Sequence, residues 1–214
     1  MSRVVVGKRQ FDEGVVVDRA VEVFWRQGYA ATSIDDLVRA TGLGRGSLYG
    51  AFGNKTELFL RAVERYRMKV GQLLTPPSGL EPRQALEAIF NRIVDTNLAE
   101  DCPAGCLLTK ACTEFATLPA EAREHVLAGL ADMEELFRAI LGEAKRRGQL
   151  ATAVDVDQLA HFFVGVHQAL AVLAAAGAGR EVLSGIVGVS LAVWTSDGDV
   201  SGSRPVRQRR AGLR

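Results

Sequence analysis

The residues of this chain with the clearest chemistry lie in segment 42–49, which reads Gly-Leu-Gly-Arg-Gly-Ser-Leu-Tyr. Arg45 can donate hydrogen bonds to guanine O6 and N7 or bind a phosphate, and Ser47 can bind a base edge or a phosphate. Gly44 and Gly46 have no side chain, so the backbone beside them can approach the floor of a DNA groove. The segment therefore predicts contacts with double-stranded DNA.

Two short helices with a tight turn at Gly42 are predicted to position these side chains. The first follows Ser33-x-x-Asp36, which resembles a capping box with Asp in place of Glu, and the second covers residues 45–52. Apolar residues give each helix a buried face: Ile34, Leu37 and Val38 in the first, and Leu43, Leu48 and Phe52 in the second. This is the layout of a helix-turn-helix motif, whose second helix enters the major groove. The pattern also fits an ordinary helical hairpin inside an all-helical core.

The chain also contains three cysteines and three histidines, which are candidates for a nucleophile and a general base. In a remote alternative the protein is an enzyme whose nucleophile and base come from Cys106, Cys112, His125, His161 and His167. No recognised nucleophile signature, phosphate-binding loop or carboxylate pair accompanies them, and the spacing of the cysteines fits no usual zinc pattern. We therefore expect no enzyme activity, no metal and no cofactor.

The formal net charge of +1 hides an uneven distribution of charged side chains. Residues 1–75 carry 12 basic and eight acidic side chains (net +4), and residues 76–203 carry nine and 17 (net −8). Residues 204–214 carry five arginines and no acid. The basic first segment suits DNA binding, and the acidic second segment suits another task. In a third alternative, the arginine-rich tail drives nonspecific, strongly salt-dependent DNA binding.

Helical signals cover almost the whole chain, and no segment has the sustained alternation of a strand. One helix is predicted from the Asp12 cap to Gly28, and another from near Asn54 to Thr75. After the break at Pro76-Pro77, five more are expected over residues 82–97, 104–117, 119–147, 155–176 and 180–194. We predict an all-α fold of about nine helices, with a helix-turn-helix DNA-binding domain over 1–53, a second helical domain over 54–195 and a disordered basic tail over 196–214.

The sequence predicts a cytoplasmic protein. It opens with no targeting leader, and an odd number of cysteines does not suggest a disulfide scaffold. The apolar stretch 159–178 approaches the length of a membrane span, but His161, His167 and Gln168 would be costly in lipid. We expect a buried helix there and no membrane contact.

Residues 12–59 resemble the DNA-binding domain of the TetR/AcrR family of transcriptional regulators. The matching positions are Val21-x-x-Phe24, Gly28-Tyr29-x-x-Thr32-Ser33-Ile34, Ala40-Thr41-Gly42-Leu43, Gly46-Ser47-Leu48-Tyr49, Phe52 and Lys55-x-x-Leu58. They cover about a quarter of the chain. The resemblance implies an all-helical homodimer with a three-helix DNA-binding head and a larger ligand-binding body. It also implies repression from a palindromic operator that is relieved when a small-molecule effector binds the body.

The resemblance also assigns roles within the head. It places Thr32 and Ser33 at the cap of the helix that lies on the DNA backbone, Tyr49 and Lys55 on phosphates, and Arg45 and Ser47 in the groove. One departure is that Gly50 and Ala51 stand where the family often has bulky or basic residues. Base readout would then rest on Arg45 and on DNA shape.

Dimerisation and ligand binding are predicted for the larger C-terminal body. In the family the last two helices build a four-helix dimer interface, and the small residues of 155–176 and 180–194 fit that role; the alternative is the core of a monomer. A ligand pocket is mostly apolar with a few polar groups. The candidate ligand contacts are Phe90, Val94, Cys106, Phe115, Phe137, Phe163 and His167, although the same helical spacing predicts core equally well.

The segment Gly105-Cys106-Leu107 looks like the start of helix six in a TetR subgroup, some of whose members respond to electrophiles or oxidants. A helix N-terminus lowers the pKa of a thiol, which would favour a reactive Cys106 with Cys102 and Cys112 as resolving partners. The alternative is that Cys106 is buried and inert.

Overall fold

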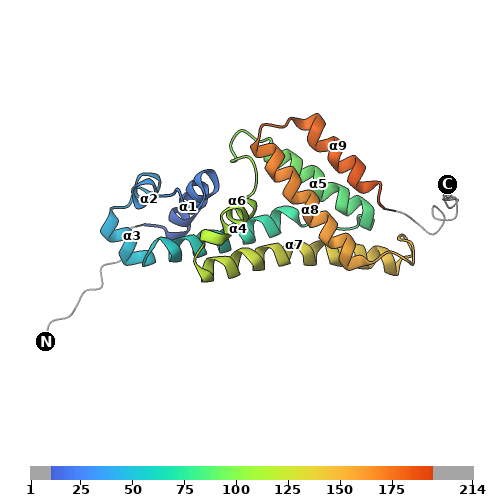
Figure 1. Cartoon of the computed structure of the whole chain (residues 1–214), viewed down its shortest axis with the longest axis horizontal. Helices are drawn as coiled ribbons and strands as arrows, with labels where there is room; N and C mark the ends of the chain where they lie inside the picture. Colours follow the sequence, from blue (N-terminus) through green and yellow to red (C-terminus); the bar gives the residue numbers. More distant parts are fainter. Residues whose placement is uncertain (1–10, 195–214) are drawn as a thin grey trace, which may run out of the picture.

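The computed structural model describes residues 11–194, and the predicted tail over 196–214 lies outside them. The described residues form nine α-helices, one short 3-10 helix and no strand, so the all-α prediction is confirmed (Figure 1). The helices are α1 (Glu13–Gln27), α2 (Ile34–Thr41), α3 (Arg45–Phe52), α4 (Lys55–Leu74), α5 (Pro82–Asn97), α6 (Leu107–Thr113), α7 (Ala120–Arg146), α8 (Val156–Ala175) and α9 (Arg180–Leu191), with the 3-10 helix at Phe115–Thr117.

The helices divide into a small head, α1 to α3, and a larger body, α4 to α9 (Figure 1). The body helix α4 begins beneath the head and runs toward α5, while α8 and α9 lie at the far end of the molecule. The short helix α6 lies where head and body meet, and it packs on α1, α4, α7 and α8. A movement of α6 would therefore change its packing against both the head and the body.

Local sequence signals explain where the head helices begin and end. The Asp12 carboxylate accepts a hydrogen bond from the amide of Gly14 at 2.8 Å and caps α1. Ser33 and Asp36 form the predicted capping box of α2: the Asp36 amide donates to Ser33 Oγ at 3.1 Å, and the Ser33 amide donates to Asp36 Oδ2 at 2.9 Å. Gly42 ends α2 in the left-handed conformation, with φ of +74°. The predicted turn between the two short helices is confirmed.

The helix expected over 104–117 is shorter than predicted. Gly105 has a φ of +95°, and Cys106 is extended, so α6 begins only at Leu107. At its other end the chain leaves helical geometry at Glu114 and forms the separate 3-10 helix. The last predicted helix is also shorter, because the chain after Leu191 forms a turn instead of continuing α9.

The core consists of two clusters of buried apolar side chains. The first joins the head to the neighbouring part of the body and includes Phe24, Leu37 and Phe52 of the head, Leu58 and Phe59 of α4, and Leu107 and Leu108 of α6. The second fills the far part of the body and includes Leu86, Phe90, Phe137, Leu141, Phe163 and Leu183. The predicted domain boundary at 53/54 falls inside the first cluster, because the first half of α4 packs on the head.

Gly28 and Glu114 form a close contact between head and body. Gly28 ends α1 with a φ of +84°, a conformation that favours glycine. A Cβ atom at this position would lie 2.0 Å from Glu114 Oε1, and the amide of Ala30 donates to Glu114 Oε2 at 3.0 Å. A carboxylate from the end of α6 thus occupies the place of a side chain in the head.

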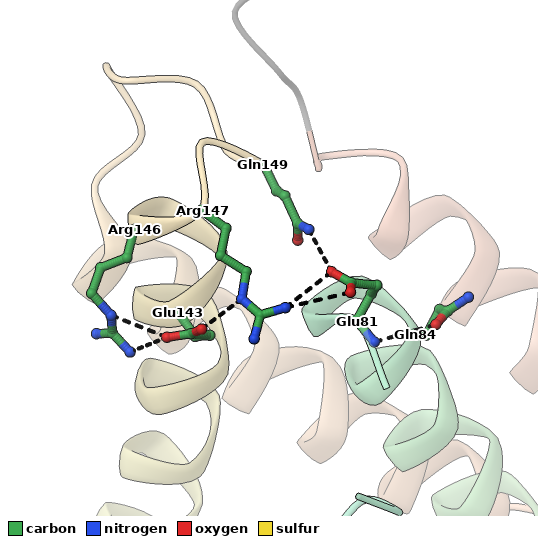
Figure 2. A network of polar contacts seen from close by, with 6 residues as sticks. All are labelled: Glu81, Gln84, Glu143, Arg146, Arg147 and Gln149. Atoms are coloured by element: carbon green, nitrogen blue, oxygen red, sulfur yellow. Dashed lines mark hydrogen bonds and ion pairs between the residues drawn. The ribbon is translucent and has the colours of Figure 1, made fainter. Parts of the chain in front are cut away.

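A polar network joins α5, α7 and the loop after α7 (Figure 2). Glu81, at the cap of α5, accepts hydrogen bonds from Arg147 Nη1 at 3.2 Å and from Gln149 Nε2 at 2.7 Å, and Arg147 Nε donates to Glu143 at 2.6 Å. The indole Nε1 of Trp194 donates to the carbonyl of Gln149 at 2.9 Å. Exposed pairs contribute only about 0–1 kcal/mol each, so these contacts add little to stability. They connect the start of α5 with the end of α7, and the Trp194 bond connects the residue after α9 to the same loop.

The helix α8 has the length and composition of a membrane span. It nevertheless packs against α5, α7 and α9 and buries His167 together with apolar residues such as Phe163 and Leu170. The opposite face of α8 is exposed, so the prediction of a buried helix over 159–178 holds for one face of the helix only.

Candidate nucleic-acid interface

The outer face of α3 carries five of the predicted DNA-binding residues. Leu48 and Phe52 point into the head and are almost fully buried. The opposite face is exposed and consists of Gly44, Arg45, Gly46, Ser47 and Tyr49. A Cβ atom at Gly44, Gly46 or Gly50 would meet nothing within 4 Å, so nothing in the described chain covers the backbone on this face. The exposed face of α3 is therefore mostly backbone and small side chains, with Arg45 as its cation and Tyr49 as its aromatic ring.

Arg45 lies at the start of α3 and pairs with a carboxylate of α2. Its Nη2 atom donates to both oxygens of Asp35, at 2.6 and 2.7 Å. Both side chains are about 60% exposed, at 60% for Arg45 and 62% for Asp35. A water-exposed pair of this kind is weak, so Arg45 can be drawn from Asp35 toward a stronger anionic or bidentate acceptor. Sequence reasoning missed Asp35, because ten residues and a turn separate the partners.

Tyr49 is the other large side chain on this face, and 45% of it is exposed. Phe52, one turn further on, points the other way and lies under the guanidinium of Arg61, whose Cζ atom is 5.5 Å from the ring centroid. The buried ring and the body helix α4 therefore fix the orientation of α3, while Tyr49 remains available to solvent.

The predicted cap at residues 32 and 33 is only half right. Ser33 is the exposed N-cap of α2, as expected. Thr32 is 2% exposed, and its hydroxyl donates to the carbonyl of Gly28 at 2.6 Å. Its side chain therefore closes the turn after α1 and points inward, away from solvent. Sequence spacing alone could not separate these two adjacent hydroxyls.

Lys55 also points inward and binds backbone carbonyls that the sequence alone does not identify. Its Nζ atom donates to the carbonyls of Tyr29 at 2.8 Å and Thr32 at 3.0 Å, and it lies 4.3 Å from the centroid of the Tyr29 ring. Partial burial lowers the pKa of Lys55, and the nearby Glu114 carboxylate opposes this shift. In the DNA-free head Lys55 thus holds the turn between α1 and α2 in place.

The predicted ligand-binding residues do not gather around one cavity. Phe90, Phe137 and Phe163 are fully buried and pack together with ring centroids 5.5 to 6.0 Å apart. With the buried Val94 they fill the body core. Phe115 is partly buried against the other core cluster. These aromatic residues form core here, which is the alternative that their helical spacing left open.

His167 and Cys106 are buried in different surroundings. Burial lowers the pKa of His167 to about 4, and its Nδ1 atom has no hydrogen-bond partner. Cys106 is 6% exposed, lies beside the buried hydroxyl of Tyr66 and borders a cavity of about 540 Å³ between α1, α6 and α8. Of the seven predicted ligand contacts, Cys106 lines this cavity.

The other cysteines and histidines do not form a reactive pair with Cys106. Burial raises the pKa of both the Cys102 and the Cys112 thiols. His125 Nδ1 pairs with the Glu121 carbonyl of its own helix, and His161 Nε2 lies 3.2 Å from Glu134. Among residues 11–194, no three His, Cys, Asp or Glu side chains are grouped as a metal site would require.

The outer faces of α8 and α9 expose apolar side chains and glycines. Val189 is 75% exposed, and Gly165, Gly185 and Gly188 have open space where a Cβ would stand. The other exposed large apolar residues of these two helices are Phe162, Val172 and Val182, of which Val172 also borders the cavity of about 540 Å³. These residues lie on the two helices for which the sequence predicts a dimer interface.

The chain was compared with known protein families and structures. Two family models match it: "Bacterial regulatory proteins, tetR family" over residues 16–62 and "Tetracyclin repressor-like, C-terminal domain" over residues 82–182. The chain is 32% identical over 189 residues to the HTH-type transcriptional repressor ComR of Escherichia coli K12, covering 86% of this chain and 89% of ComR. It is 30% identical over 190 residues to the uncharacterized HTH-type regulator YezE of Bacillus subtilis, covering 86% of this chain and 97% of YezE.

A solved structure with the same fold contains DNA. It is a cysteine variant of the TetR family transcriptional regulator CifR in complex with 26-base-pair double-strand operator DNA. The TM-score is 0.79 and the sequence identity 29%, with 88% of this chain and 100% of the CifR chain covered.

Proposed function

Because this chain belongs to the TetR family of bacterial transcriptional regulators, we propose that it acts as a homodimeric repressor, released from a near-palindromic operator by a small molecule. It is a DNA-binding regulator with an N-terminal helix-turn-helix domain, and it is not an enzyme. Its proposed partner is double-stranded DNA, so its proposed place of action is the bacterial cytoplasm, without membrane contact.

The exposed face of α3 is the observation that carries the proposal. Gly44, Gly46 and Gly50 leave the backbone of α3 uncovered, which allows the helix to lie deep in the major groove. Arg45 would then reach guanine or a phosphate, Ser47 a base edge or a phosphate, and Tyr49 a phosphate. Because the side chains of Thr32 and Lys55 point inward, the proposed phosphate contact at the start of α2 is the cap at Ser33.

The exposed face of α8 and α9 supports the proposed dimer. A symmetric dimer buries the same face of both copies, and the open glycines allow the helices to approach closely. Two heads in such a dimer would read two half-sites one helical turn or a multiple apart, about 34–36 Å per turn. The operator is therefore expected to be nearly palindromic.

Selection of bound duplexes from a random-sequence pool tests this proposal. We expect enrichment of a near-palindrome, and gel shifts at physiological salt should show preference for it over a shuffled duplex of the same composition. If no sequence is enriched and binding only falls steeply with salt, the chain is the nonspecific basic binder considered above.

A substitution at Asp35 tests whether its pair with Arg45 opposes DNA binding. We expect Asp35→Asn to raise affinity for a shuffled duplex about two- to fivefold, since an exposed pair is worth about 0.2–1 kcal/mol and its loss frees Arg45. Gel shifts measure the change, and Glu87→Gln, at an exposed site on α5, is the control with the same charge change. Equal gains in both variants, or weaker binding in Asp35→Asn, would contradict this role of Asp35.

The finer assignment to the Gly-Cys-Leu subgroup rests on Gly105, Cys106 and Leu107. The position of Cys106 on the wall of a cavity is compatible with sensing by its thiol. Its burial and the raised pKa values of the Cys102 and Cys112 thiols favour a packing role instead. We therefore propose noncovalent ligand binding as the main signal.

A further inference from the structure

The cavity of about 540 Å³ between head and body has a distinctive chemical lining. Its walls come from α1, from the segment before α6, from α6 and from α8. The charged residues of the lining are Arg26 and Lys110, and no carboxylate is among them. Within residues 11–194 neither cation forms an ion pair. An anion would find two unpaired positive charges here.

Buried hydrogen-bond donors without acceptors add a second, independent observation. The indole Nε1 of Trp25, a residue of the cavity wall, is buried and has no partner in the described chain. Thr109, also in the wall, donates its hydroxyl to Gln168 Oε1, and the Gln168 Nε2 atom is buried without an acceptor. An indole and an amide nitrogen can only donate, and an unmade buried hydrogen bond costs about 1–3 kcal/mol. Two buried donors thus stand without an acceptor, one on a residue of the cavity wall and one on the hydrogen-bond partner of Thr109.

Much of the remaining wall is apolar. Ala171, Val172 and Ala175 of α8 line it together with Trp25 and Gly105. Gly105 packs closely on α8, because an added Cβ would lie only 3.2 Å from the carbonyl oxygen of Ala171. The volume is within the usual range for small-molecule sites, about 300–1,000 Å³.

We propose that this cavity is the effector site and that its ligand is a small aromatic organic anion, an aryl carboxylate being the simplest member of the class. This inference rests on the proposed function. The ring packs between Trp25 and α8, and the carboxylate lies near Arg26 and Lys110. Because α1 and α6 both form the wall, a ligand that binds better when they separate also changes the Glu114 contact with the head.

Calorimetric titration of the intact protein with 2-naphthoate tests the site, with the neutral isostere 2-naphthamide as the matched ligand. We expect naphthoate to bind at least tenfold more tightly than naphthamide, and Lys110→Met and Arg26→Met to abolish that preference. Arg83→Met, an exposed cation on α5, is the control and should keep it. Equal affinities for the two ligands, no binding of naphthoate at millimolar concentration, or an unchanged preference in both cavity variants would overturn the proposal.

A gel shift on the selected operator separates this inference from the proposed function. Naphthoate should release the wild type but not Lys110→Met. If naphthoate binds and the operator stays bound, the cavity is no effector site, and the inference fails while the repressor proposal stands. If the protein binds no selected operator even without naphthoate, the repressor proposal fails, whatever the calorimetry shows.

Discussion

Arg45→Ala is expected to weaken operator binding by about 30-fold or more. A bidentate contact between arginine and guanine contributes about 1–3 kcal/mol, and a symmetric dimer would lose it in both heads. The folded state should be unaffected, because Arg45 is exposed and pairs only with Asp35. Fluorescence anisotropy with the selected operator at fixed salt measures the loss.

A second readout separates base contacts from phosphate contacts. If Arg45 reads a base, the loss should be large on the operator and small on a shuffled duplex. If it binds a phosphate, both duplexes should lose affinity alike, and the slope of log K against log salt should fall by about 0.9 per head. Arg83→Ala, in the body, is the control. Unchanged operator affinity in Arg45→Ala would refute our placement of α3 in the groove.

Val189→Glu is expected to convert the protein to a monomer and to abolish detectable operator binding. Val189 is the most exposed large apolar residue within 11–194, at 75%, and lies on the proposed dimer face. Two uncompensated carboxylates buried in a symmetric interface would each cost several kcal/mol. A monomer would then lose the avidity of two linked heads, a factor of about 10²–10⁴.

Sedimentation at micromolar concentration measures the oligomeric state of this variant, and circular dichroism checks that its helices remain. The matched control is Leu127→Glu, which places the same charge on α7 at a residue that is 52% exposed. The control should stay dimeric and bind the operator. A dimeric Val189→Glu protein, or loss of the dimer in both variants, would exclude α9 as the centre of the interface.

The sequence predicted the head well because its signals are local. The capping box of Ser33 and Asp36 and the left-handed turn at Gly42 depend on neighbours a few residues away. With the ends of both helices defined, the exposed face of α3 follows from the buried positions of Leu48 and Phe52. The same local rules overextended the sixth helix, since the backbone of Gly105 breaks a pattern that is helical in its side chains.

The side-chain contacts of the site could not be predicted in this way. Lys55 bonds to carbonyls 23 and 26 residues earlier in the chain, and Glu114 bonds to an amide 84 residues away. Such pairs exist only after the helices have packed. Helical spacing also cannot tell a core ring from a pocket ring, so Phe90, Phe137 and Phe163 gave no guide to the cavity between α1, α6 and α8.

The contact between Gly28 and Glu114 limits how this protein can be recombined with its relatives. A side chain at position 28 would have to adopt a φ of +84°, and its Cβ would push the end of the Glu114 side chain away from the amide of Ala30. A body without that carboxylate would leave the same amide without this acceptor. Chimeras that exchange heads to redirect a sensor to a new operator therefore keep this contact between head and body only when both positions come from the same parent.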